Sequence, residues 1–246
     1  MVGSADTPIL AAVGIRKRFG ALPVLDGVDF AVGAGDAVGI VGPNGAGKTT
    51  LLNVLSGALR PTEGSIAFRG ATVTRAGVSA RCRLGIGRAH QVPRPFGDMS
   101  VFENVFVGAA TGGRLRGKRA YARCIDVLEL CGLTELANRQ AESLGLLDRK
   151  RLELARALAT GPVVLLLDEI GAGLTDAEAD ELVATIRQVH GQGIAIIWIE
   201  HIVHVLVQVV ARLVCLDAGR VIADGEPGVV MSDAAVVGAY LGGVVA

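Results

Sequence analysis

The sequence predicts an α/β fold with a mostly parallel β-sheet and an inserted helical subdomain. Short apolar, β-branched runs alternate with helical patterns, and the strand signals vanish in the middle of the chain. Several runs lack polar alternation, as expected of strands buried on both faces of a sheet. The runs that predict strands are 9–15, 28–32, 37–41, 65–68, 163–167, 194–199, 213–216 and 221–223.

Two helical patterns between these runs have recognisable ends. One begins after Thr49 and ends before Arg60, which Pro61 follows. The other opens with a capping box, in which Thr175 stands three residues before Glu178. Its apolar face is formed by Leu182, Ile186 and Val189. Alternation of this kind implies a largely parallel sheet.

The middle of the chain carries helical rather than strand patterns. Proline and glycine residues punctuate segments such as the predicted helix 119–130. We therefore expect a single domain over 1–246, with a helical subdomain at about 92–147. The α/β core then comprises about 1–91 and 148–246.

Composition excludes several classes of protein. The 246 residues have a mean hydropathy of +0.50 and 51% apolar residues, which hints at a membrane protein. A membrane-spanning helix needs about 20 consecutive apolar residues. The largely apolar stretch 202–216 is too short and is interrupted by His204, Gln208 and Arg212. The 24 cationic and 24 acidic side chains balance, which argues against a general nucleic-acid binder. The N-terminus lacks a signal-peptide pattern, so we expect a cytoplasmic protein.

The four cysteines suggest neither a zinc ribbon nor a disulfide framework, because no CxxC pair occurs. Cys124 and Cys131 fall on one helical stripe with Tyr121, Ile125 and Leu128. We expect Cys124 and Cys131 to be thiols of the core.

A phosphate-binding motif follows the run 37–41. The segment from Gly42 to Thr49 fits GxxxxGK[ST] and opens a helix. Its glycines let backbone N–H groups turn toward phosphate oxygens, Lys48 reaches the β and γ phosphates, and Thr49 offers a hydroxyl to Mg²⁺. The alternative is an ordinary glycine turn. The residues expected to bind nucleotide here are Gly42, Pro43, Asn44, Gly45, Ala46, Gly47, Lys48, Thr49 and Thr50.

Two adjacent carboxylates end the run 163–167. A buried strand delivers Asp168 and Glu169 to the edge of the sheet where nucleotides bind in such folds. Asp168 is placed to hold Mg²⁺, and Glu169 to polarise the attacking water.

With these motifs the chain resembles the ATP-binding subunits of ABC transporters over nearly its whole length. The resemblance implies a P-loop NTPase fold with an N-terminal antiparallel β region, and ATP hydrolysis coupled to transport, with Mg²⁺ as cofactor. Phe19 matches the aromatic residue that stacks on adenine, with a core phenylalanine as the alternative. Gln91 matches the Q-loop glutamine, which contacts Mg²⁺ or the attacking water.

His201 matches the switch histidine that hydrogen-bonds the γ-phosphate. A metal pair of His201 with His204 is disfavoured, because no further ligand cluster accompanies them. The resemblance thus implies two sets of functional residues. The catalytic set is Lys48, Gln91, Glu169 and His201. The Mg²⁺ ligands are Thr49, Gln91 and Asp168.

The chain departs from the family at the signature motif, usually Leu-Ser-Gly-Gly-Gln, which grips the ATP held by the opposite subunit. The corresponding residues here are Leu144, Gly145, Leu146, Leu147 and Asp148. Glycine replaces the serine, so the hydroxyl is lost. We therefore expect one of the dimer's two ATP sites to be weakened, which favours a heterodimer.

Among ABC proteins the chain is most similar to the ATPases of branched-chain amino acid importers. Phrases that carry this resemblance include Met99–Val105, 147–156 and 198–201. The expected function is uptake of such amino acids at the cytoplasmic face of the membrane. Expected partners are a second ATPase subunit, permease subunits and, indirectly, an extracytoplasmic solute-binding protein, without nucleic acid. Alternatives are an ATP-binding regulatory subunit, export of another substrate, a DNA-repair ATPase or a GTPase.

Overall fold

The computed structural model describes residues 7–242. The two ends of the expected single domain, residues 1–6 and 243–246, lie outside the described residues. The chain divides into two compact units. One unit combines the chain up to Val78 with the chain from Ala195 onward, and the other is Ser79–Ile194.

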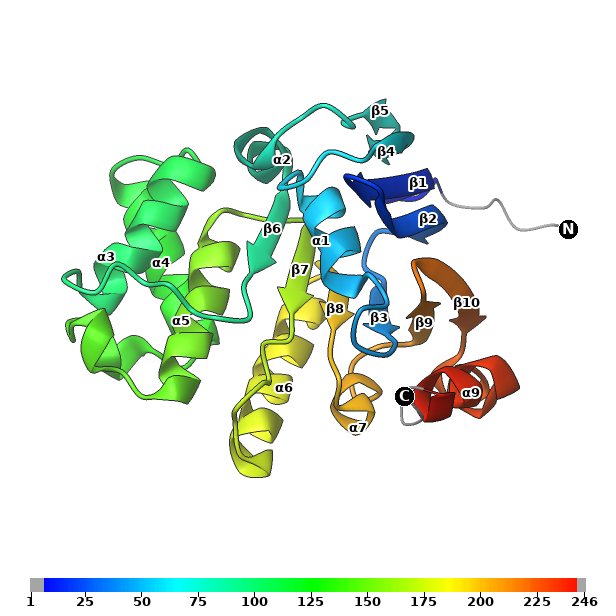
Figure 1. Ribbon diagram of the computed structural model, residues 1–246. Helices are drawn as coiled ribbons and strands as arrows, with labels where there is room; N and C mark the ends of the chain where they lie inside the picture. The colour runs from blue at the N-terminus through cyan, green and yellow to red at the C-terminus, as the bar shows by residue number, and fades with distance from the viewer. Residues whose placement is uncertain (1–6, 243–246) are drawn as a thin grey trace, which may run out of the picture. The chain divides into compact units, whose positions relative to one another are not determined.

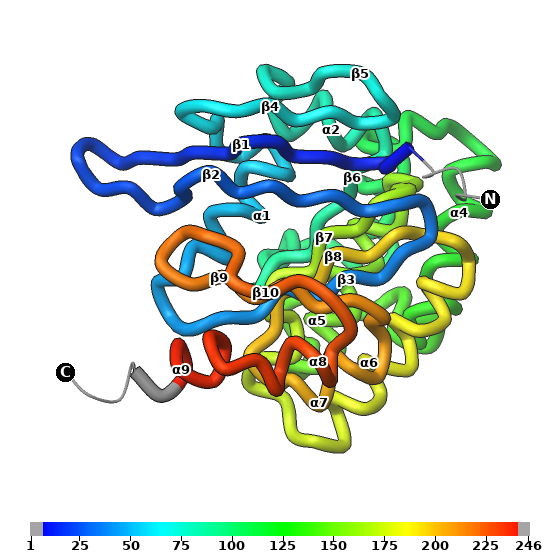
Figure 2. The backbone as a smooth tube through the Cα atoms, turned by 90° about the vertical axis from the view of Figure 1, so that its right-hand side faces the viewer, coloured from blue at the N-terminus to red at the C-terminus, as the bar shows by residue number. Residues whose placement is uncertain are grey.

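An antiparallel sheet begins the first unit. Its strands are β1 (Leu10–Phe19), β2 (Leu22–Val32), β4 (Glu63–Phe68) and β5 (Ala71–Thr72), in the order β2-β1-β4-β5. Figure 2 shows β1, β2 and β4 running side by side. This confirms the antiparallel β region implied for the N-terminal part of the chain.

The first unit also holds parallel strands. The central strand β3 (Ala37–Val41) pairs in parallel with both β8 (Ala195–Ile199) and β9 (Arg212–Asp217). The last strand, β10 (Arg220–Gly225), is antiparallel to β9. Every residue of β3 and β8 is buried, as expected of apolar runs without alternation.

Within residues 7–242, the first unit holds four helices. They are α1 (Lys48–Ser56), α7 (Val203–Leu206), α8 (Pro227–Ser232) and α9 (Ala234–Gly242). Helix α1 begins at Lys48, within the phosphate motif, so the motif opens a helix as predicted. Helices α8 and α9 lie beside β10 near the C-terminal end of the described chain (Figure 2).

The second unit holds two parallel strands, β6 (Ile86–Ala89) and β7 (Val164–Asp168). Helix α2 (Val78–Leu84) leads into β6. Strand β6 was not predicted from the sequence, because it has only four residues and includes a glycine and an arginine. At Gly87 a side chain has no room, since a Cβ atom would lie 2.9 Å from Pro162 Cβ.

Helices occupy the chain between β6 and β7. They are α3 (Val101–Val107), the π-helix η1 (Gly108–Gly112), α4 (Lys118–Leu130), the 3₁₀ turns η2 (Thr134–Leu136) and η3 (Ala141–Ser143), and α5 (Leu146–Ala159). Figure 1 shows α3, α4 and α5 packed as one group. The inserted helical region is thereby confirmed, and its limits at 92 and 147 stay a prediction.

The second unit ends with α6 (Asp176–Gly191), which the capping box predicted. The hydroxyl of Thr175 accepts from the backbone N–H of Glu178, and the Glu178 carboxylate accepts from the N–H of Thr175.

None of the helices within residues 7–242 combines the length and the apolar character that a membrane-spanning helix needs.

The prediction that Cys124 and Cys131 are core thiols is confirmed. Cys124, Cys131 and Leu128 are buried, and burial raises the pKa of the Cys131 thiol to about 12. Tyr121 and Ile125, however, are 55% and 56% exposed. The helical period alone does not determine where the buried face of α4 ends, because that depends on the neighbouring helices.

Candidate functional site

The phosphate motif forms a tight loop between β3 and α1. Two of its glycines sit where no other residue fits. At Gly42, with φ of +141°, a Cβ atom would lie 2.0 Å from the carbonyl oxygen of Leu216. At Gly47, with φ of +102°, it would lie 2.8 Å from that of Val24. Close packing against neighbouring backbone therefore requires glycine at both positions.

Lys48 is the first residue of α1 and is only 6% exposed. Its ammonium group folds back over the loop, with Nζ 2.7 Å from the carbonyl oxygen of Gly42 and 3.0 Å from that of Pro43. Thr49 is exposed in the first turn of the helix. The loop thus combines a buried cation, a hydroxyl and the positive end of a helix, which suits a polyphosphate.

Two distant segments brace this loop from within the same unit. The turn between β9 and β10 donates the N–H of Gly219 to the carbonyl of Ala46, at 3.1 Å. Helix α9 contributes Tyr240, whose hydroxyl oxygen accepts the N–H of Gly42 at 2.8 Å. Burial raises the pKa of Tyr240. The role of Tyr240 was not foreseen, because nothing in its local sequence indicates a partner 198 positions away.

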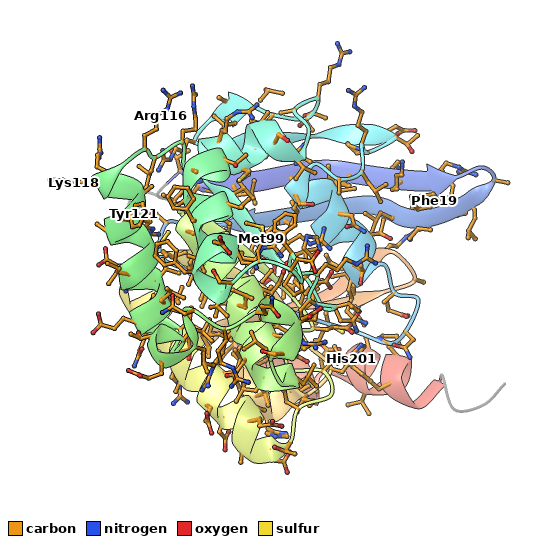
Figure 3. The ribbon with its side chains drawn as sticks, turned by 90° about the vertical axis from the view of Figure 1, so that its left-hand side faces the viewer. Phe19, Met99, Arg116, Lys118, Tyr121 and His201 are labelled. Carbon is orange, nitrogen blue, oxygen red and sulfur yellow. The ribbon has the colours of Figure 1, made fainter. Side chains whose placement is uncertain are left out.

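Phe19 and His201 belong to the same unit as the phosphate loop (Figure 3). Phe19 ends β1 and is 48% exposed, so it is not a core residue. The ammonium of Lys17 lies 5.1 Å from the centre of its ring. His201 is exposed just after β8, and its backbone N–H donates to the carboxylate of Glu200.

The acidic pair lies in the other unit. Asp168 is the last residue of β7 and is 5% exposed, with a carboxylate oxygen 2.6 Å from a guanidinium nitrogen of Arg88. Glu169 has a φ of +45°, in the left-handed region that non-glycine residues rarely adopt. The backbone therefore turns sharply between the two carboxylates.

This turn brings Glu169 to the predicted Q-loop glutamine. The amide nitrogen of Gln91 donates to the Glu169 carboxylate at 2.6 Å. The ammonium of Lys150, on α5, in turn donates to the backbone carbonyl of Gln91 at 2.7 Å. Arg88 and Lys150 were missed as functional candidates, because their importance comes from contacts across the fold and not from a motif.

A cavity of about 470 Å³ adjoins these side chains within the second unit. Burial and the positive charge of Arg88 lower the pKa of His90 at its edge. The cavity combines both signs of charge. It is lined by His90, Gln91, Val92, Arg94, Glu153, Arg156 and Asp168.

The signature segment forms the start of α5, with Gly145 as its N-cap and no capping side chain. Leu144 is buried, whereas Leu146 is 44% exposed. Asp148 stands in the first turn, 3.4 Å from a guanidinium nitrogen of Arg151. A Cβ atom at Gly145 would meet nothing within 4 Å, so this position has room for a side chain.

The predicted site residues therefore fall into two groups. The first unit holds Phe19, the loop 42–50 and His201, and the second unit holds Gln91, Asp168, Glu169 and 144–148. Mg²⁺ prefers oxygen ligands, and hydroxyl, carboxylate and amide oxygens are what the expected ligand residues offer. Because the amide nitrogen of Gln91 bonds Glu169, its oxygen is the atom suited to a cation.

The similarity to known proteins extends over nearly the whole chain. A family model described as ABC transporter matches residues 25–172. The chain is 36% identical over 252 residues to the high-affinity branched-chain amino acid transport ATP-binding protein LivG of Escherichia coli (strain K12), covering 96% of this chain and 98% of that protein. It is 34% identical over 250 residues to BraF, the corresponding protein of Pseudomonas aeruginosa, with the same coverage.

Two solved structures have the same fold. One is a nucleotide-free ATP-binding cassette from an ABC transporter, with a TM-score of 0.88, 30% identity and coverage of 95% of this chain and 99% of that one. The other is an ATP-binding cassette of an ABC transporter in its ADP conformation, with a TM-score of 0.88, 31% identity and coverage of 96% and 100%.

Proposed function

Because the chain belongs to the family of ABC transporter ATPases, we propose that it is the ATP-hydrolysing subunit of an importer for branched-chain or related amino acids. The relatives with this transport role match the chain almost from end to end, which supports the substrate class. The observation that carries the catalytic role is the contact of Gln91 with Glu169 at the end of a buried strand.

The phosphate loop binds the triphosphate of ATP. Loop amides and the start of α1 surround the phosphate oxygens, and Lys48 neutralises the charge of the β and γ phosphates. Its ammonium is already directed at the loop by the carbonyls of Gly42 and Pro43. Phe19 offers an exposed ring face for adenine, where stacking adds about 0.5–1.5 kcal/mol beyond burial.

Glu169 accepts the proton of the attacking water, and Gln91 holds its carboxylate in place. Bound Mg²⁺, held by Thr49, Gln91 and Asp168, would neutralise charge that develops on the phosphates. His201 contacts the γ-phosphate through its imidazole. Arg88 orients Asp168 through their ion pair.

Two such subunits close around ATP, each contributing the start of α5 to the ATP held by its partner. ATP then acts as a ligand that favours the closed pair, and hydrolysis releases it. We place the pair at the cytoplasmic face of the membrane, against permease subunits that a solute-binding protein serves from the other side. The absent serine at position 145 favours a heterodimer.

A second candidate function is that of an ATP-binding regulatory subunit. It is favoured by the start of α5, where glycine and Asp148 replace the serine and glutamine of the usual signature. In that case the ATP site of the partner turns over slowly, and this chain serves mainly to hold the pair together.

Replacement of Glu169 tests the catalytic role. With permease and partner subunits present, Glu169→Gln should lower phosphate release about 10²- to 10⁴-fold, because a general base is lost. ATP binding, measured by retention of labelled nucleotide, should persist. The control Glu129→Gln changes an exposed glutamate on α4 and should leave turnover unchanged. Normal turnover in Glu169→Gln would contradict the assigned role.

Substrate class is tested separately. Proteoliposomes with the complete complex should accumulate labelled leucine, isoleucine or valine in an ATP-dependent manner. Uptake of an unrelated solute, with none of these three, would overturn the amino acid assignment while leaving the ATPase role intact.

A further inference from the structure

A cluster of cations lies between η1 and the first turn of α4. Arg114, Arg116, Lys118 and Arg119 are all exposed and lie within six consecutive positions of the chain. We call these four residues the cationic patch. Figure 3 shows Arg116 and Lys118 extending outward at the same end of α4.

The four cations of the patch stand close together in the chain without counter-charges. Several other arginines meet carboxylates, as Arg16 and Arg220 do at Asp26, or Arg212 at Asp224. None of the four patch residues forms an ion pair or a side-chain hydrogen bond within residues 7–242. The chain as a whole is neutral, so this excess is local.

The placement of these cations opposes the local electrostatics. Lys118 and Arg119 stand in the first turn of α4, where the helix dipole is positive, and no acidic residue stands there. The N-cap residue, Gly117, has no side chain that accepts a hydrogen bond from the helix. Like charges in this position destabilise the isolated chain, and an anionic surface would relieve the repulsion.

An aromatic cluster adjoins the patch. Tyr121, one turn after Lys118, is 55% exposed, and its ring centre lies 5.3 Å from that of Phe102 and 5.5 Å from that of Phe106. A ring with one apolar side and a polar hydroxyl suits the interface between water and lipid. Cations beside such an aromatic residue are typical of a surface that meets phospholipid headgroups.

We propose that the cationic patch binds anionic phospholipid headgroups, so that α4 rests on the membrane beside the permease. The inference rests on the proposed function, which brings this chain to a membrane. A nucleic acid fits less well, because the charge excess covers only one end of one helix and aromatic residues border it. An acidic protein segment also fits less well, because its binding would not explain the exposed Tyr121 beside the cations.

Vesicle flotation tests the proposal with the purified full-length chain. Vesicles of phosphatidylcholine with phosphatidylglycerol should carry the chain at low salt, and vesicles of phosphatidylcholine alone should not. Each cation near an anionic surface adds to the free energy of binding. Loss of two cations in the double variant R116Q/K118Q should therefore lower the partition coefficient about 30-fold. High salt should weaken binding of the unaltered chain in the same direction.

The control variant R75Q/R139Q removes the same charge from two exposed arginines outside the patch. It should retain most of the binding. Equal losses in the two variants, or equal binding to neutral vesicles, would overturn the assignment to the patch. Binding to acidic peptides but not to anionic vesicles would overturn the lipid as its partner.

Transport activity separates this inference from the proposed function. If the chain floats with anionic vesicles through the patch but drives no uptake with its partners, the transport role fails and the lipid contact stands. If R116Q/K118Q floats with anionic vesicles like the unaltered chain while uptake is normal, the lipid contact fails and the transport role stands.

Discussion

Glu169 adopts a backbone conformation that most residues avoid. Its φ of +45° costs of the order of 1–3 kcal/mol for a residue with a side chain. The conformation turns the chain immediately after Asp168, so that adjacent carboxylates point to different partners, Arg88 and Gln91. Two neighbouring acids thereby obtain separate roles, one oriented by a cation and one by an amide.

The negative charge of the buried Asp168 is compensated by Arg88. Its side chain is only 7% exposed, and that of Arg88 only 12%. Burial of either charge alone would be costly, and the pair with its 2.6 Å contact offsets that cost. A cation bound at Asp168 therefore joins a site in which the carboxylate already has a fixed orientation.

Replacement of Tyr240 should weaken the phosphate loop. In Tyr240→Phe the buried N–H of Gly42 loses its acceptor, at a cost of about 1–3 kcal/mol. We expect a lower free energy of unfolding and a several-fold higher KM for ATP, with a smaller change in kcat. Denaturant unfolding and steady-state phosphate release measure these quantities.

The chain provides a matched control, because its sequence contains only two tyrosines. Tyr121→Phe removes the hydroxyl of an exposed residue on α4, in the unit that does not contain Gly42, and should leave the KM for ATP unchanged. If Tyr240→Phe behaved in the same way, the contact with Gly42 would have no part in nucleotide binding.

At the scale of elements, the start of α5 is a site where a side chain can be restored. Gly145 has φ of −66° and ψ of 172°, which suits serine as an N-cap, and space for a Cβ atom is open. Gly145→Ser should raise turnover at the partner's ATP site about tenfold or more, since a hydrogen bond to a charged phosphate contributes about 1.5–3 kcal/mol. Phosphate release by the assembled pair measures it.

Gly145→Ala serves as the control for backbone effects, because it adds the Cβ atom without the hydroxyl. A gain with alanine equal to that with serine would show that the hydroxyl is irrelevant. No gain with either would indicate that Asp148, in place of the usual glutamine, limits the site.

The capping box of α6 predicts a stability change that depends on pH. Hydrogen bonds from the backbone and hydroxyl of Thr175 lower the pKa of Glu178 from its ordinary value of 4.5. The contribution of the carboxylate is therefore fully present above pH 4.5 and is lost as the pH falls through the lower, folded-state pKa. Glu178→Gln should destabilise the chain at neutral pH, and the difference should shrink in acid.

Thr175→Ala removes the other half of the same box and should cost about 1 kcal/mol of unfolding free energy at neutral pH. Urea unfolding at several pH values checks both variants. A loss from Glu178→Gln that stays constant down to strongly acidic pH would contradict the role of its ionised carboxylate.

At the scale of the whole molecule, the altered signature bears on assembly. If the partner is a different chain, the purified protein alone should hydrolyse ATP slowly, even at concentrations where it dimerises. Addition of the partner chain should then raise turnover. Light scattering with and without ATP, together with phosphate release, measures this. Full turnover by a homodimer would contradict the heterodimer.

Local motifs allowed much of the fold and the candidate site to be predicted. The phosphate loop, the acidic pair after β7 and the box before α6 are contiguous in sequence, so their chemistry and spacing are visible there. Strand β6 was missed, because four residues with a glycine and an arginine carry no pattern. The exposure of Tyr121 and Ile125 could not be predicted, since the helical period does not define the width of a buried face.

The sequence by itself determined the ATPase chemistry and the kinds of residue proposed to perform it, because a phosphate loop requires glycine, lysine and a hydroxyl at fixed spacing. Only the tertiary structure decided which distant side chains support that chemistry. Tyr240 reaches Gly42, Arg88 reaches Asp168, and Lys150 holds Gln91. These contacts join residues far apart in the chain, so they arise from packing and leave no local signal.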